Sequence, residues 1–159
     1  MMKQAQLISH SQQETLRLAE RFAGVLKGGE VVLLRGPIGA GKTIFVKGVA
    51  AALHLKSSPT SASFSLMKEY KNKRVRLFHI DLFRLEAGEV FNLGFEEMLE
   101  DDQAIILAEW PDPIAALLPS DRLEMNFILK NGDERCIELR SSGRTSDVLL
   151  EHLCKAANN

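Results

Sequence analysis

The sequence predicts an α/β domain in which a mixed, mostly parallel β-sheet is flanked by helices. Two continuous apolar runs, within residues 30–36 and 104–110, are typical of strands buried on both faces of a parallel sheet. Amphipathic helical segments alternate with strands along the chain. No repeat, low-complexity segment or linker interrupts the 159 residues, so a single domain over residues 1–159 is expected.

The composition excludes several classes of protein. Hydrophobic residues make up 45% of the chain and charged residues 26%, as in an ordinary globular protein. The formal net charge of -1 gives no global field that could hold nucleic acid unaided, so contact with RNA would need a partner. The two cysteines lack C-x-x-C spacing and suit a reducing cytosol. Because no apolar run reaches the length of a signal peptide or a membrane span, a cytoplasmic protein is expected.

The first predicted element is an amphipathic helix within residues 9–29. Ser11 and Glu14 have the spacing of a capping box, and Gly28 and Gly29 are expected to end the helix in a left-handed conformation. The apolar stripe of this helix consists of Leu16, Ala19, Phe22, Ala23 and Leu26.

A strand over residues 30–36, a glycine-rich loop and a helix to about His54 come next. Extended stretches over residues 63–70 and 75–82 follow, joined by the polar turn "KNKR". The remaining predicted elements are a helix over residues 86–101 with a break near Gly94, a strand over 104–110, a hairpin over 122–140 centred on Asn131-Gly132, and a helix over about 146–157.

The glycine-rich loop carries the clearest chemical signal. Its sequence "GPIGAGKT" has the spacing of a P-loop, and the strand before it and the helix after it are the context that such a loop requires. Lys42 is expected to reach the β- and γ-phosphates of a nucleotide, and the Thr43 hydroxyl to bind Mg²⁺. ATP is the expected nucleotide, because the guanine-specific Asn-Lys-x-Asp pattern is absent. The predicted nucleotide-binding residues are Gly36, Gly39, Ala40, Gly41, Lys42, Thr43 and Ile44.

A magnesium ion at this loop needs a further acidic ligand at the end of a neighbouring buried strand. Asp81 closes the stretch "RLFHID" and Glu109 closes "AIILAE". Since the run before Glu109 is more completely apolar, it is the better candidate for a central strand. We therefore expect Thr43 and Glu109 to hold the metal and Asp81 to orient water or metal, with Lys42, Asp81 and Glu109 as the catalytic residues.

For several other side chains the sequence raises both a structural and a functional interpretation. Trp110 either lies beside the nucleotide or a partner, or packs in the core or its rim. His79 is expected to be structural, because phosphoryl transfer to water at a P-loop needs no imidazole base. The basic residues Lys68, Lys71, Lys73, Arg74 and Arg76 form either a solvated hairpin or a contact with tRNA or an acidic partner.

Three further stretches, "SASFSLMKEY" (61–70), "FHIDLFRL" (78–85) and "LAEWPD" (107–112), follow the loop in a recognisable order. Together with the loop they resemble the bacterial TsaE family, also called YjeE, over most of the chain. The resemblance departs from the family at residues 61–63, which read Ser-Ala-Ser where the family usually has Ser-Pro-Thr, and at Phe83, where it usually has Tyr.

The resemblance implies a small P-loop NTPase domain that acts in threonylcarbamoyladenosine modification of tRNA. By position, Lys42 and Thr43 are the phosphate lysine and the magnesium threonine, Glu109 a magnesium ligand, and Asp81 the acid of the His-x-Asp element. The implied partners are the threonylcarbamoyl-transferase subunit and its paralogue, with tRNA contacted indirectly. Slow ATP hydrolysis that resets this complex is the implied activity.

Two other functions remain as alternatives. A small-molecule P-loop kinase needs a mobile, arginine-rich lid, whereas the segment "LPSDRLEMNF" contains one arginine and then reads as a strand. A non-hydrolysing, nucleotide-dependent assembly factor would not need to keep Lys42, Thr43 and two candidate acids.

Overall fold

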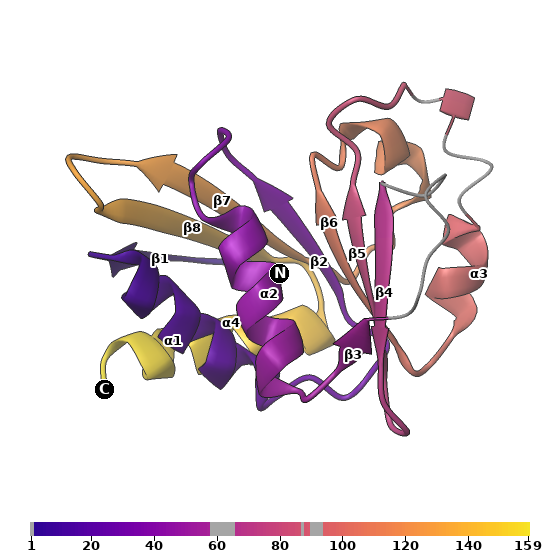
Figure 1. Ribbon diagram of the computed structural model, residues 1–159, viewed down its shortest axis with the longest axis horizontal. Helices are drawn as coiled ribbons and strands as arrows, with labels where there is room; N and C mark the ends of the chain where they lie inside the picture. The colour runs from indigo at the N-terminus through magenta and orange to yellow at the C-terminus, as the bar shows by residue number, and fades with distance from the viewer. Residues whose placement is uncertain (1, 58–65, 87, 90–93) are drawn as a thin grey trace.

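The computed structural model describes residues 2–57, 66–86, 88–89 and 94–159. In this part of the chain one eight-stranded sheet has the strand order β1-β8-β7-β2-β6-β5-β4-β3 (Figure 1). The strands are β1 (Lys3–Ser9), β2 (Val31–Arg35), β3 (Lys56–Ser57), β4 (Met67–Lys71), β5 (Arg76–Asp81), β6 (Ala104–Glu109), β7 (Leu123–Leu129) and β8 (Arg135–Ser141). The helices are α1 (Gln12–Ala23), α2 (Lys42–Ala52), α3 (Phe95–Glu100), the 3-10 helix η3 (Asp112–Leu117) and α4 (Arg144–Ala157).

The centre of the sheet is parallel and its two sides are antiparallel. Strand β2 pairs in parallel with β6 and β7, and β6 pairs in parallel with β5. Antiparallel pairs extend the sheet through β8 and β1 on one side and through β4 and β3 on the other. The predicted mixed α/β sheet is thus confirmed, with its parallel pairs confined to the four central strands.

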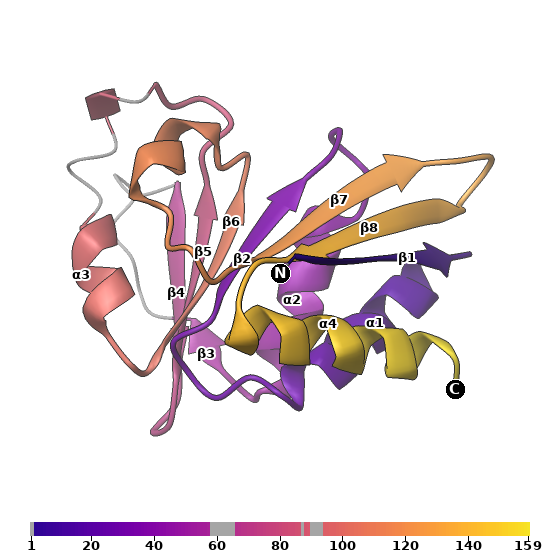
Figure 2. The same cartoon turned by 180° about the vertical axis from the view of Figure 1, so that it is seen from behind.

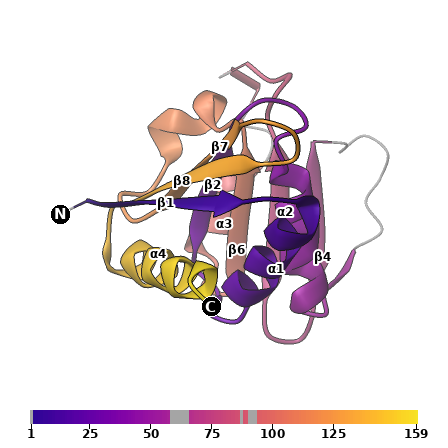
Figure 3. The same ribbon diagram turned by 90° about the vertical axis from the view of Figure 1, so that its left-hand side faces the viewer.

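Helices cover both faces of the sheet, as predicted. Helices α1, α2 and α4 lie on one face, where they bury one set of side chains from the central strands, such as Val32 and Leu107 (Figures 2 and 3). The alternate residues of the same strands, such as Leu33 and Ile106, pack against α3 and η3 on the other face. Both apolar runs are therefore buried on two sides, which explains why they do not alternate with polar residues.

Most predicted elements are present, with shifted boundaries. Ser11 caps α1 by accepting a hydrogen bond from the Glu14 backbone N–H at 3.1 Å. The predicted end of the first helix is wrong, because α1 ends at Ala23. Gly28 and Gly29 have φ angles of 111° and 90° in the turn that leads into β2. The hairpin joins β7 to β8 through Gly132, whose φ angle is 61°.

One strand was not predicted from the sequence, and two stretches discussed above lie wholly or partly outside the described residues. Strand β1 was not expected, because only Leu7 and Ser9 of its seven residues are buried and the apolar signal is short. The Ser-Ala-Ser stretch at residues 61–63 and the first part of the predicted helix over 86–101, at residues 87 and 90–93, lie outside the described residues.

No helix in the described part of the chain is both long and apolar enough to cross a membrane.

Helix α2 lies close to α1 at Gly48. A Cβ atom at this position would lie 2.8 Å from the Ala19 Cβ and 3.2 Å from the Leu16 Cδ2. We predict that Gly48→Ala lowers the free energy of unfolding by about 1–3 kcal/mol, although alanine is the better helix former, because the two helices must separate.

Urea denaturation measures this effect, with Gly88→Ala as the matched control. No heavy atom lies within 4 Å of a Cβ at Gly88, so the control should change stability by less than about 0.5 kcal/mol. Stabilisation by Gly48→Ala would contradict the close approach of α1 and α2.

Candidate functional site

The glycine-rich loop connects the carboxyl end of β2 to the start of α2. Two of its glycines are needed for different reasons. Gly36 has a φ angle of 129°, and a Cβ there would lie 3.1 Å from both the carbonyl carbon and the Cβ of Phe127, so β7 leaves no room for a side chain. Gly39 has a φ angle of 83°, and no heavy atom lies within 4 Å of its Cβ position, so its backbone faces open space.

A cavity of about 340 Å³ lies at this loop. It lies at the carboxyl ends of β5 and β6, because Asp81 ends β5 and Trp110 directly follows β6. The residues that line it come from α1, the loop, α2 and the ends of these two strands: Gln12, Ile38, Gly39, Gly41, Lys42, Thr43, Ile44, Asp81, Phe83 and Trp110.

Lys42 is buried beneath the loop. Its Nζ donates hydrogen bonds to the carbonyl oxygens of Gly36 and Pro37 and lies 4.0 Å from the centroid of the Trp110 ring. Burial lowers the pKa of the Lys42 ammonium group, and the nearby Glu109 and Asp81 carboxylates partly offset this effect. The ammonium group is therefore a cation with little water around it, held by weak partners that an anion could replace.

Glu109, the last residue of β6, forms a hydrogen bond between the sheet and the start of α2. Its carboxylate accepts a hydrogen bond from the Thr43 hydroxyl at 3.1 Å and lies 2.9 Å from the Nε2 of His79. Burial by itself raises the pKa of the Glu109 carboxyl, but the hydrogen bond and charge of His79, with smaller effects from Thr43 and Lys42, outweigh it and lower the pKa. Glu109 is thus held ionised although only 2% of it is exposed.

Asp81 lies directly beside Glu109 in the parallel β5–β6 pair. Its carboxylate accepts a hydrogen bond from the Phe83 backbone N–H at 3.1 Å, and it lines the cavity. Of the two acids, only Glu109 contacts Thr43, which favours Glu109 over Asp81 as the residue nearest to a loop-bound cation. Their predicted division of roles stays a prediction.

The donor set fits a magnesium ion bound together with phosphates. Thr43, Glu109 and Asp81 offer the hard oxygen atoms that Mg²⁺ prefers. No group of three or more His, Cys, Asp or Glu side chains that could hold a metal occurs among the described residues. Such an ion would therefore complete its coordination with phosphate oxygens and water, as is usual for Mg²⁺.

Two further side chains lie beside Glu109 and Lys42. His79, expected to be structural, contacts the carboxylate of Glu109, because alternate residues of β5 and β6 share a face of the sheet. Trp110 has a φ angle of 55°, which turns its ring over Lys42 and to 4.9 Å from the Phe83 ring. Trp110 lines the cavity and is half-buried, and a place beside the nucleotide stays a prediction.

The basic stretch between β4 and β5 is partly neutralised. Arg76 forms ion pairs with Glu69 at 2.8 Å and with Asp101 at 3.0 Å. Lys68, Lys71 and Lys73 remain exposed, as a solvated hairpin requires. This arrangement reduces the positive charge available for an RNA contact.

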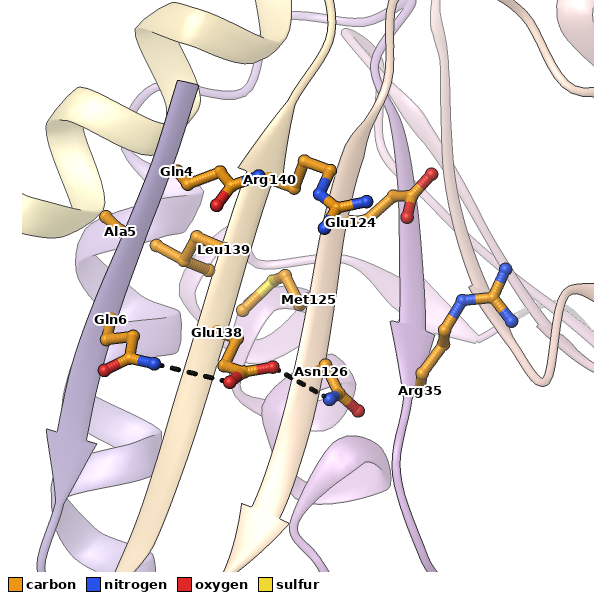
Figure 4. A pocket seen from close by; sticks show the side chains of 10 residues that line it. All are labelled: Gln4, Ala5, Gln6, Arg35, Glu124, Met125, Asn126, Glu138, Leu139 and Arg140. Atoms are coloured by element: carbon orange, nitrogen blue, oxygen red, sulfur yellow. Dashed lines mark hydrogen bonds between the residues drawn. The ribbon is translucent and has the colours of Figure 1, made fainter. Parts of the chain in front are cut away.

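A second, larger hollow of about 710 Å³ lies on the sheet face that α1, α2 and α4 leave uncovered (Figure 4). Side chains from β1, β8, β7 and β2 line it. Glu138 lies at its centre, where it accepts hydrogen bonds from Gln6 at 3.3 Å and Asn126 at 3.1 Å. These polar groups satisfy one another, and the loop contributes none of them, so this hollow is separate from the candidate site.

The fold and the loop together define an α/β domain of the P-loop class. A sequence model described as "Threonylcarbamoyl adenosine biosynthesis protein TsaE" matches residues 9–137. The chain belongs to the TsaE family.

Individual relatives agree with this assignment. The "tRNA threonylcarbamoyladenosine biosynthesis protein TsaE" of Bacillus subtilis is 34% identical over 157 residues, which cover 99% of this chain and 98% of that protein. The protein of the same name from Aquifex aeolicus is 37% identical and covers 76% of this chain and 90% of its own. The crystal structure of Bacillus subtilis YdiB superposes with a TM-score of 0.76 at 31% identity, covering 100% of this chain and 99% of that one.

The ionised state of Glu109 has a consequence for stability. We predict that Glu109→Gln lowers the free energy of unfolding by about 1–3 kcal/mol at pH 7, because the bonds from His79 and Thr43 lose a charged acceptor. The folded pKa lies below the ordinary value of 4.5, so this contribution is fully present above pH 4.5 and is lost as the pH falls through the folded pKa.

Urea denaturation of both proteins at pH 7 and at successively lower pH tests this sign. Glu20→Gln, at an exposed position of α1, serves as the control for loss of a carboxylate and should change the free energy of unfolding by less than about 0.5 kcal/mol. A stability difference that grows as the pH falls would mean that burial, and not His79, decides the charge of Glu109.

Proposed function

We propose that this protein is the ATP-binding and slowly hydrolysing subunit required for threonylcarbamoyladenosine modification of tRNA. The contact of 3.1 Å between the Thr43 hydroxyl, which lines the loop cavity, and the Glu109 carboxylate carries the proposal. It brings a P-loop hydroxyl and a strand-ending acid together in a member of a family named for this modification.

The residues of the loop bind the phosphates. Lys42 exchanges the carbonyl oxygens of Gly36 and Pro37 for phosphate oxygens, which are stronger partners for a poorly hydrated ammonium group. The first backbone N–H groups of α2, from Lys42 to Ile44, have no carbonyl partner within the helix and offer their positive ends to the same anion. The Trp110 ring excludes water from one side of Lys42.

The acids act on the metal side of the site. Thr43 and Glu109 would hold Mg²⁺, which would offset the charge of the phosphates when bound. His79 fixes the Glu109 carboxylate in position through its Nε2, so the acid needs no reorganisation. Asp81, beside Glu109 in the sheet, orients water or the metal.

The nucleotide serves as a switch for association with other proteins. In this proposal the transferase subunit and its paralogue are the partners, tRNA is contacted only through them, and the work takes place in the cytoplasm. Ordering of a loop near the γ-phosphate, as in other P-loop proteins, would distinguish the ATP state from the ADP state. The net charge of -1 favours this indirect role over direct binding of tRNA.

Lys42 is the most direct test of the nucleotide site. We predict that Lys42→Ala weakens ATP binding by about a hundredfold or more, because a charged hydrogen-bond donor is lost. Isothermal titration calorimetry measures the affinity, and circular dichroism checks the fold. Lys47→Ala, at an exposed position of the same helix, should bind as the wild type does. Unchanged affinity in Lys42→Ala, with the fold intact, would contradict the assignment of the loop.

The switch is tested separately by a pull-down. We expect the transferase subunit and its paralogue to bind this protein more tightly with a non-hydrolysable ATP analogue than with ADP or with no nucleotide. The isolated protein should release phosphate from ATP slowly. Equal recovery of the partners in all three conditions would contradict the switch, and rapid phosphoryl transfer to a metabolite would replace it with the kinase alternative.

A further inference from the structure

Arg135 is a buried cation outside the nucleotide-binding motif. It is the first residue of β8, where it pairs with Ser9 of β1 and Leu129 of β7. Alternate residues of β8, such as Ile137, belong to the core beneath α1, α2 and α4, so Arg135 lies on the helix-covered face. Only 4% of it is exposed.

Two of the three nitrogen atoms in the Arg135 guanidinium group are buried without a partner. Its Nε and Nη1 atoms are buried, and neither has a hydrogen-bond acceptor within the described chain. Ser9, the residue of β1 that pairs with Arg135, has other hydrogen-bond partners. Its hydroxyl lies 2.8 Å from the Thr15 hydroxyl and donates to the Ser11 carbonyl at 2.9 Å. A buried, unpaired charge is costly, so its presence needs an explanation beyond packing.

The guanidinium group lies against the P-loop. A Cβ atom at Gly41 would be 2.8 Å from Nη1 and 3.8 Å from Cζ of Arg135. Gly41 is the N-cap of α2, with a left-handed φ angle of 104°, and it directly precedes Lys42. The guanidinium group therefore lies beside the positive end of α2, at the residue before Lys42, and an anion bound at the loop would offset the positive charge of both.

We propose that Arg135 is a positioning residue for the phosphates of the nucleotide. It does not line the cavity, and its Nη1 is buried behind Gly41, so it acts through the loop and does not touch the ligand. Its side chain keeps Gly41 in the left-handed conformation, and its charge is compensated when phosphates occupy the loop. This inference rests on the proposed nucleotide site and adds a residue of the C-terminal hairpin to it.

The test separates a positioning role from a purely structural one. In Arg135→Met, which replaces the buried charge by an apolar chain of similar length, we expect ATP and inorganic pyrophosphate to bind about tenfold more weakly. The ligand-free melting temperature should be equal to that of the wild type or higher by about 2–4 °C, because an uncompensated charge is removed. A residue that only supports the fold would give the opposite pair of results.

Two variants complete the comparison by calorimetry. Arg135→Lys keeps the charge and should retain most of the affinity, whereas Arg140→Met removes a charge from the other face of the same strand and should bind as the wild type does. Wild-type affinity in Arg135→Met, or equal losses in Arg135→Met and Arg140→Met, would overturn the inference. If the wild type itself binds neither ligand, the proposed nucleotide site fails and not the role of Arg135.

A measurement on the unchanged protein covers the case in which Arg135→Met does not fold. The Nε–H signal of Arg135 in nitrogen-edited NMR should shift when pyrophosphate is added, and that of Arg140 should not. An Arg135 signal that stays in place while pyrophosphate binds would overturn the inference.

Discussion

The parallel pairing of β6 with β2 and β5 is the constraint on which the site depends. It aligns Glu109 with Leu34 on one side and with Asp81 on the other. Parallel strands end at the same edge of the sheet. This register therefore places the loop and both acids close together at that edge. A shift of one residue would turn Glu109 to the opposite face of the sheet and separate it from Thr43. The apolar residues that fill both faces of these strands therefore fix the chemistry at their ends.

The site is also an arrangement of buried charges that compensate one another incompletely. Glu109 is fully engaged by Thr43 and His79, and its charge is stabilised. Lys42 is held by backbone carbonyls, and the Nε and Nη1 atoms of Arg135 have no acceptor among the described residues. The two cations and the two nearby carboxylates, Glu109 and Asp81, are therefore equal in number but poorly paired. Poor pairing of this kind costs stability in the free protein, and an anion bound at the loop would offset that cost.

Much of the fold could be predicted from the sequence, because its signals are local. The apolar runs at β2 and β6, the glycine spacing of the loop and the Asn131-Gly132 hairpin each specify structure over a few residues. Strand β1 was missed because an edge strand with one covered face needs few apolar residues. The contacts of His79 with Glu109 and of Arg135 with Gly41 depend on strand register, which joins residues 30 and 94 positions apart. Such contacts leave no pattern in a single sequence.

The left-handed backbone of Trp110 has a practical consequence. The chain contains one tryptophan, and this conformation holds its ring 4.0 Å from the Lys42 ammonium group and beside Phe83. Indole emission responds to the charge and polarity around the ring, so the protein carries its own optical reporter at the loop. Occupancy of the loop can be followed in the native chain, without a dye or label, by light that comes from a single known position.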